Sequence, residues 1–229
     1  MKELSEGKGK YIVLTIAIIV IGLSIAGGTY AWLTQAANVT NANYNVSSHC
    51  FSVEYTINNQ DNTQDITGTL FPGSGPSKGL SGRVGLKTGT GCSLNANGTL
   101  KLHLNSGTST RFGTVAEGHC ENEETYETLN DYTTSSECFG HGTWTTTSTV
   151  LKYAVYDNST ATGSPLGAGY ITTSDIGADK IIAENLPITT TQAYYYIFIW
   201  LDGYLTDNTY TELPLSGYIK AEATQRPSS

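Results

Sequence analysis

Positive charge is scarce in this sequence, and its scarcity limits what the protein can bind. Only 14% of the residues are charged, and 12 Lys and Arg stand against 20 Asp and Glu. No Lys or Arg lies between Lys10 and Lys78, or between Arg111 and Lys152. Phosphate backbones are bound by clustered Lys and Arg. We therefore expect no nucleic acid partner.

Signatures of catalysis are also missing. After residue 34 no segment has the 3.6-residue period of an amphipathic helix. None of the four histidines belongs to the paired His and Glu pattern of a zinc peptidase helix. We therefore expect no enzyme, no catalytic residue, no cofactor and no metal site. A secreted hydrolase is kept as a third class, for which the sequence offers no convincing nucleophile.

One long run without charge dominates the N-terminus. Residues 11–33 carry no charged side chain, and Lys2, Lys8 and Lys10 precede them. As a helix this run would span about 34 Å, enough to cross a hydrocarbon core of about 30 Å. The lysines favour a cytoplasmic N-terminus. We therefore predict a contact with the membrane through residues 11–33 and an extracellular C-terminal part at the cell membrane or cell surface.

The same run is consistent with a signal peptide. Gly27, Gly28 and Ala31 supply the small residues of a cleavage junction. A retained transmembrane anchor and a cleaved signal therefore both stay open. The expected organisation is a cytoplasmic stub and membrane or signal segment in 1–33, a linker or donor strand in 34–48, and an extracellular β-sandwich domain in 49–229.

Period-two alternation replaces the apolar run from residue 51 onward. Apolar and polar residues alternate here, with Phe51, Val53, Tyr55 and Ile57 at the apolar positions. This pattern predicts a strand with one solvent-exposed face. Similar segments are 66–71, 80–87, 99–104, 150–156, 170–173, 180–183, 194–201 and 217–223. About nine short strands with polar turns and no helices between them predict an all-β, two-sheet antiparallel sandwich or jelly roll, preceded by one N-terminal transmembrane or signal helix.

The aromatic segment 194–201 allows two interpretations. Its two faces are both apolar, with Tyr195 and Ile197 on one and Phe198 and Trp200 on the other. A carbohydrate-stacking platform is one interpretation. A central strand buried on both faces is the one we favour, because inward aromatics hold β-sandwiches together.

Four cysteines lie on the exported side, where the compartment is oxidising. They allow three pairings, of which we favour Cys50 with Cys92 and Cys120 with Cys138. A competing interpretation is a zinc site formed by Cys120 and Cys138 with the nearby His119 and His141. The adjacent positions of His119 and Cys120 fit that site poorly, so we prefer disulfides.

An acidic segment lies between Glu117 and Glu137. Its carboxylates are hard oxygen ligands, which makes it a weak calcium candidate. The candidate ligands are Glu121, Glu123, Glu124, Glu127 and Asp131. The spacing of an EF-hand loop is absent, so we favour a solvated loop held by a disulfide. The threonine-rich stretch 143–149 after it is expected to be an edge strand or an exposed contact surface.

The end of the apolar run carries a family resemblance. The stretch Ala26-Gly27-Gly28-Thr29-Tyr30-Ala31-Trp32-Leu33-Thr34 resembles the signal junction of the TasA and camelysin family of Gram-positive surface and biofilm-matrix proteins. Leu33, Thr34 and Gln35 replace the usual continuation of that junction, and the cysteines are a further departure. The resemblance implies a jelly-roll subunit that is exported and polymerises through strand exchange. Segment 39–46 is the expected donor strand.

These observations favour a structural or adhesive cell-surface protein. One such function is that of a fibre subunit that associates with other copies of itself. The alternative is a membrane-tethered module that binds a glycan or a surface protein.

Overall fold

The computed structural model describes residues 47–48, 51–57, 60–61, 63–73, 75–89 and 96–225. The chain separates into two units, 1–35 and 36–229, and every described residue belongs to the second. The predicted helix in 11–33 and the expected donor strand 39–46 lie outside the described residues. Within the described ranges, no helix combines the length and the apolar character that crossing a membrane requires.

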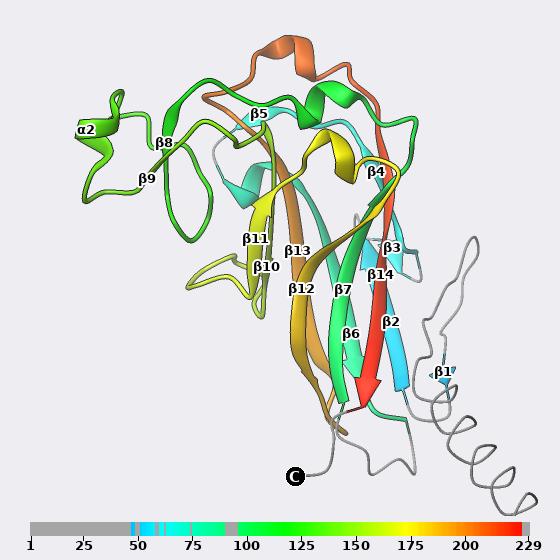
Figure 1. Cartoon of the computed structure of the whole chain (residues 1–229). Coiled ribbons are helices and arrows are strands. Elements are labelled where there is room, and N and C mark those ends of the chain that lie inside the picture. Colours follow the sequence, from blue (N-terminus) through cyan, green and yellow to red (C-terminus); the bar gives the residue numbers. More distant parts are fainter. Residues whose placement is uncertain are drawn as a thin grey trace, which may run out of the picture. The chain divides into compact units, whose positions relative to one another are not determined.

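Two antiparallel sheets make up most of the described fold (Figure 1). The elements are β1 (Ser47–Ser48), β2 (Phe51–Ile57), β3 (Gln60–Asp61), β4 (Asp65–Gly68), β5 (Pro72–Gly73), β6 (Leu80–Lys87), β7 (Ala96–Leu104), β8 (His119–Glu121), α2 (Ser135–Cys138), β9 (Thr143–Thr145), β10 (Leu151–Tyr156), β11 (Gly167–Tyr170), β12 (Asp179–Ile188), β13 (Ala193–Asp202) and β14 (Leu215–Gln225). The eight-stranded sheet has the order β1-β2-β6-β13-β10-β11, with β3 beside β2 and β5 beside β13. The four-stranded sheet has the order β12-β7-β14-β4, and β8 pairs with β9 in a separate ribbon.

One hydrophobic cluster joins the two larger sheets. In β2 of the eight-stranded sheet, buried residues alternate with half-buried ones, and Ile57 is fully enclosed. In β7 of the four-stranded sheet, Leu100, Leu102 and Leu104 alternate with half-buried residues in the same way. Both sets belong to the same cluster. Period-two burial of this kind is typical of antiparallel sheets with one covered face. The predicted all-β fold with antiparallel sheets is confirmed.

Strand β13 departs from this alternation because both of its faces are covered. It pairs with β6 on one side and β10 on the other. Ile197 and Ile199 face the shared core, whereas Phe198 and Trp200 form a second cluster with Ala154 and Tyr156 of β10. The prediction of a central, doubly buried aromatic strand is confirmed.

Most strands that follow one another in the chain lie in different sheets. The chain runs from β2 in the eight-stranded sheet to β4 in the four-stranded sheet, returns to β6 and crosses again to β7. The same exchange occurs from β12 to β13 and from β13 to β14. Neighbours within a sheet are therefore mostly distant in sequence.

Some predicted boundaries are wrong. The segment predicted as one strand at 66–71 belongs to β4 only up to Gly68, and the separate short strand β5 begins after it, at Pro72. The strand predicted at 170–173 ends at Tyr170 instead. Thr172 and Asp175 form a capping box that starts the 3-10 helix Thr173–Asp175. Reciprocal capping bonds of this kind compete with strand pairing for the same backbone groups.

Asp175 makes the turn after β11 sensitive to acid. Burial alone would raise the pKa of its carboxyl, but hydrogen bonds from Thr172 and Lys180 hold that pKa below its usual range. A lowered folded pKa stabilises the fold above the unfolded pKa, 3.8, and this contribution disappears as the pH falls below that value.

We expect Asp175→Asn to lower the free energy of unfolding at pH 7 by about 1 kcal/mol, the usual cost of a lost cap. The difference in the free energy of unfolding between the variant and the parent should shrink as the pH falls from 4 to 2.5. Urea unfolding of both proteins at each pH measures it. A difference that stayed constant down to pH 2.5 would contradict the assignment.

The two outer strands of the four-stranded sheet differ in how their edges are protected. Strand β12 has two register shifts, Asn185 at a φ of 58° and Pro187 within the strand. Bulges and proline discourage the addition of another strand. The opposite border is formed by β4, which pairs with β14 only over 215–218.

Strand β14 is consequently open along half of one side. It pairs with β7 over 217–225, but no described strand pairs with its other side beyond Tyr218. On that side the Ile219 N–H donates to the carbonyl of Gln64, at 2.9 Å, and the Ala221 N–H donates to the Tyr55 hydroxyl, at 3.0 Å. We call residues 219–225 the open half of β14.

Candidate functional site

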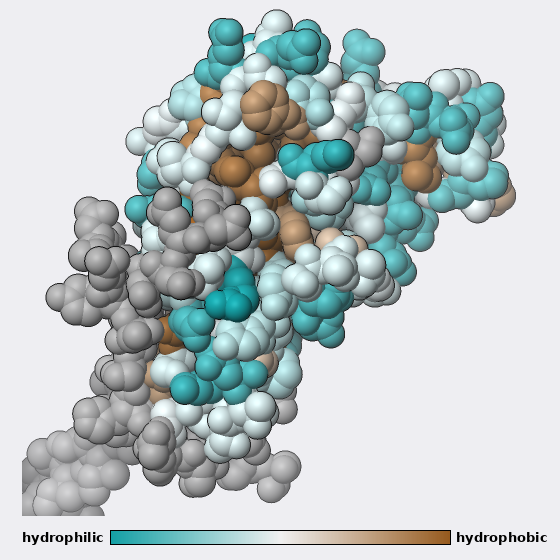
Figure 2. Space-filling model, turned by 180° about the vertical axis from the view of Figure 1, so that it is seen from behind, coloured by the Kyte–Doolittle hydropathy of each residue, from teal (hydrophilic) through white to brown (hydrophobic). Residues whose placement is uncertain are grey.

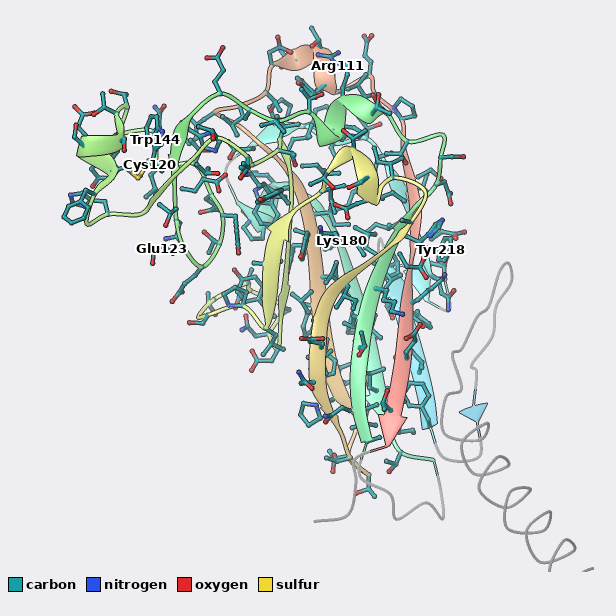
Figure 3. The ribbon with its side chains drawn as sticks, viewed as in Figure 1. Arg111, Cys120, Glu123, Trp144, Lys180 and Tyr218 are labelled. Carbon is teal, nitrogen blue, oxygen red and sulfur yellow. A yellow bond between two sulfur atoms is a disulfide. The ribbon has the colours of Figure 1, made fainter. Side chains whose placement is uncertain are left out.

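The densest group of buried charges lies under a lobe formed by residues 117–147. The lobe contains the ribbon β8-β9 and the helix α2, which project from one side of the two sheets (Figure 1). Thr134 and Glu137 form the capping box that starts α2. Figure 3 places Cys120, Trp144 and Glu123 in this lobe, away from Lys180 and Tyr218 on the four-stranded sheet. Sequence patterns predicted a disulfide here and an edge strand near 143–149, but neither the strand β8 nor the helix α2.

A disulfide bond closes the lobe. Cys120 in β8 and Cys138 in α2 are bonded and almost fully buried, which confirms the predicted pairing. The zinc interpretation is wrong, because these two sulfurs are bonded to each other and His119 has oxygen partners. Cys50 and Cys92 lie outside the described residues, so their pairing stays a prediction.

Lys152 is the centre of the buried charges. On β10, Leu151 and Tyr153 face the shared core, so Lys152 points from the opposite face of the sheet toward the lobe. Its side chain has no exposed surface. The ammonium donates hydrogen bonds to the Glu121 carboxylate and to the Ser148 hydroxyl. Lysine is almost never fully buried unless it is paired.

Glu121 reaches Lys152 from the lobe. Its side chain is 6% exposed, and its Oε1 atom also lies 2.8 Å from His119 Nε2. Burial alone would raise the pKa of Glu121, but the hydrogen bond from His119 and the charge of Lys152 lower that pKa below its usual range. Glu121 is therefore a carboxylate at neutral pH.

His119 is held between two oxygen acceptors. Its Nδ1 atom lies 2.6 Å from the carbonyl oxygen of Glu117, and its Nε2 atom faces Glu121. Both ring nitrogens can donate only when the imidazole is protonated. Burial lowers the pKa of His119, but the hydrogen bonds to Glu121 and Glu117 raise it above its usual range. The arrangement therefore favours an imidazolium.

A second carboxylate completes the group from β13. Asp202 is 3% exposed, and its Oδ2 atom lies 4.0 Å from Lys152 Nζ. The same oxygen accepts hydrogen bonds from the hydroxyl and the backbone N–H of Thr128 in the lobe, and Oδ1 accepts one from the Tyr204 N–H. We call Lys152, Glu121, His119, Asp202 and Ser148 the buried charge cluster.

A small cavity borders the cluster. Its volume is about 150 Å³, and its lining residues are Gly73, Gly75, Glu127, Thr128, Trp200, Asp202 and Tyr204. Gly75 has a φ of 79°, and a Cβ atom there would collide with the Glu127 carboxylate. Burial and the nearby charge of Asp202 raise the pKa of Glu127. A carboxyl in this position holds its proton more readily than one on the surface.

The five residues named as candidate calcium ligands lie in different surroundings. Glu121 belongs to the buried charge cluster, Glu127 lines the cavity, and Asp131 is exposed. Glu123 accepts a hydrogen bond from Thr143, and Glu124 accepts one from Ser164. Among the described residues, no three His, Cys, Asp or Glu side chains gather in a way that could hold a metal ion. The expected solvated loop is wrong for Glu121, because Lys152 approaches it from the sheet.

The cluster brings together groups that can react with one another. It holds a primary amine that has no exposed surface against a carboxylate, with a second carboxylate and an imidazolium beside them. Reactive groups fixed at contact distance behave as if they were present at very high concentration. Comparison with known proteins adds nothing to this assignment, because no protein-family model and no curated protein matches the chain.

Removing the disulfide is expected to loosen the lobe and leave the sheets intact. Cys120 and Cys138 are 18 residues apart, and a disulfide that closes a loop of this length stabilises the folded state by about 3 kcal/mol. We expect Cys120→Ala with Cys138→Ala to speed amide hydrogen exchange in 117–147 about 100-fold. Exchange in β7 should change little, and equal acceleration in both regions would contradict a separately opening lobe.

Proposed function

We propose that this chain is an exported cell-surface structural or adhesive protein that acts by association with other copies of itself. The uncharged run 11–33 behind three lysines supports export. The strand order supports a jelly roll, because two four-stranded groups, β4-β14-β7-β12 and β6-β13-β10-β11, exchange strands along the chain. Strand β2 then extends the second group at its β6 edge.

The open half of β14 is the observation that carries the proposal. Backbone groups that lack a strand partner accept a strand from another chain, which here would replace the single contacts of the Ile219 and Ala221 N–H groups. Ala223 has its N–H on this side, because the N–H groups of Ile219 and Ala221 point the same way and strand residues alternate. The opposite border of the sheet has bulges and Pro187, so strand addition favours the β14 side.

The expected donor matches the length of this acceptor. Segment 39–46 has eight residues, and the open half of β14 has seven. Ala42, Tyr44 and Val46 recur with period two, which gives the segment one apolar face. Donation from one copy to the next would build a head-to-tail fibre, since such contacts do not close on themselves.

Removing the donor should abolish assembly. We expect the chain lacking residues 34–48 to remain monomeric where the full exported chain forms polymers, as measured by light scattering after size exclusion and by negative-stain microscopy. Equal assembly by the shortened chain would exclude strand donation from this segment.

A matched variant tests the acceptor. Ala223→Pro removes the N–H on the open side and keeps the hydrogen bonds to β7, which come from the even-numbered residues of β14. We expect it to reduce polymer yield at least tenfold while the folded monomer persists. Polymers at the parent's yield would rule out this edge as the acceptor.

A membrane-tethered binding module is the second candidate, and a groove on the sandwich favours it. The groove has a volume of about 400 Å³, and Asp157, Glu184, Asn185, Tyr194 and Tyr195 are among its lining residues. Carboxylates and amides beside aromatic rings suit a glycan. Glycan binding that is lost in Tyr194→Ala, by a chain that stays monomeric, would favour this function over the first.

A further inference from the structure

The buried charge cluster joins two parts of the chain, the lobe and the eight-stranded sheet. Glu121 belongs to the lobe, and Lys152 belongs to the eight-stranded sheet, 31 residues further along the sequence. Their side chains are in direct contact, and neither has more than 6% of its surface exposed. We propose that Lys152 and Glu121 condense to an intramolecular amide, which attaches the lobe covalently to the sheet.

The geometry brings the reacting atoms together. Lys152 Nζ contacts Glu121 Oε1, which is bonded to the carbon that the amine must attack. The ammonium has two other polar neighbours, the Ser148 hydroxyl at 2.5 Å and Asp202 Oδ2 at 4.0 Å. Fixed proximity of this kind supplies about 7–11 kcal/mol of the barrier to a reaction between two groups.

The neighbouring groups can move the protons that the reaction requires. Asp202 accepts a proton from the Lys152 ammonium, directly or through one water, and leaves a neutral amine. His119, 2.8 Å from Oε1, supplies a proton to the Glu121 carboxylate. A neutral amine and a neutral carboxylic acid are then in contact.

The bond changes balance without any other reactant. Lys152 Nζ attacks Cδ of Glu121, a C–N bond forms, and the C–Oε1 bond breaks. The second proton of the amine passes to Oε1, which leaves as one molecule of water. The proton held by Asp202 returns to His119, so the net reaction converts an ammonium and a carboxylate into an amide and water.

Burial favours the amide over the ion pair. Two charges removed from water lose several kcal/mol of hydration each, and their attraction offsets this only in part. An amide carries no net charge, so its formation removes this cost. The departing water has room in the small cavity that Asp202 lines.

Tryptic digestion of the full chain tests the proposal directly. Trypsin cuts after Lys and Arg, and the sequence has none between Arg111 and Lys152 or between Lys152 and Lys180. An unmodified chain, reduced and alkylated, gives the peptides 112–152 and 153–180. The amide blocks cleavage at Lys152, so we expect one peptide, 112–180, lighter than its sequence by one water. Its fragment ions should be missing between Glu121 and Lys152 and present outside them.

Two variants serve as controls. Lys152→Arg keeps the positive charge and the cleavage site but cannot form this amide, so cleavage at residue 152 should return with no loss of water. Glu121→Ala removes the acceptor and should also restore cleavage. Complete cleavage of the parent at Lys152, with full peptide masses, would overturn the proposal. A link from Lys152 to the peptide 181–220 would overturn it too, because Asp202 would then be the acceptor.

Discussion

Replacing Lys152 by methionine should be among the most damaging single changes in this protein. Methionine keeps much of the side-chain volume, but it can neither form the amide with Glu121 nor neutralise the buried Glu121 and Asp202 carboxylates. Removing one partner of a buried ion pair costs about 3–5 kcal/mol. We expect a loss of this size in the free energy of unfolding of the full chain, measured in guanidinium chloride.

Lys101→Met provides the matched control. Lys101 pairs with Glu222 on the four-stranded sheet at 2.7 Å, and both side chains are partly exposed. A surface pair of this kind contributes about 0–1 kcal/mol. If Lys152→Met and Lys101→Met lowered the free energy of unfolding by similar amounts, burial under the lobe would not explain how the cluster contributes to stability.

Trp200→Ala should have an effect of comparable size for a different reason. Trp200 is 1% exposed and packs with Tyr156 and Phe198 on the outer face of the eight-stranded sheet. Truncating a buried tryptophan leaves a cavity and costs about 3–5 kcal/mol. Thermal unfolding and near-ultraviolet circular dichroism would measure the loss of stability and of fixed aromatic packing.

Tyr204→Ala is the control for this change. Tyr204 borders the same small cavity as Trp200, but it is 54% exposed. Surface substitutions usually change stability by no more than about 0.5 kcal/mol. An equal loss of stability in both variants would mean that the burial of Trp200 does not set the cost of truncating it.

The sheets could be predicted from sequence because each strand carries its own pattern. The alternation in 51–57 predicted β2 residue for residue, and the apolar run around Ile197 predicted a strand covered on both faces. These signals are local, since a strand exposes or buries alternate residues whatever its partners are. Figure 2 shows the molecule from behind, where the largest apolar area is bordered by hydrophilic residues and smaller apolar areas lie elsewhere on the same face.

The buried charge cluster could not be predicted in this way, because its members are far apart in sequence. Glu121 lies in the segment expected to be a solvated acidic loop, and Asp202 only follows the aromatic segment 194–201. One signal was nevertheless present. Lys152 is the only charged residue in a strand whose other residues are all apolar or aromatic. A lone lysine in such a strand indicates a buried partner, although it does not say which residue that partner is.

The strand order also has a consequence for how the protein is made. The last two strands are interior ones, since β13 lies between β6 and β10 and β14 lies between β7 and β4. A chain that emerges N-terminus first cannot complete either sheet until its final strands arrive. Such contacts are distant in sequence and slow to form, and the waiting strands offer open edges to other chains. The early strands must therefore stay apart until the final two strands are available to pair with them.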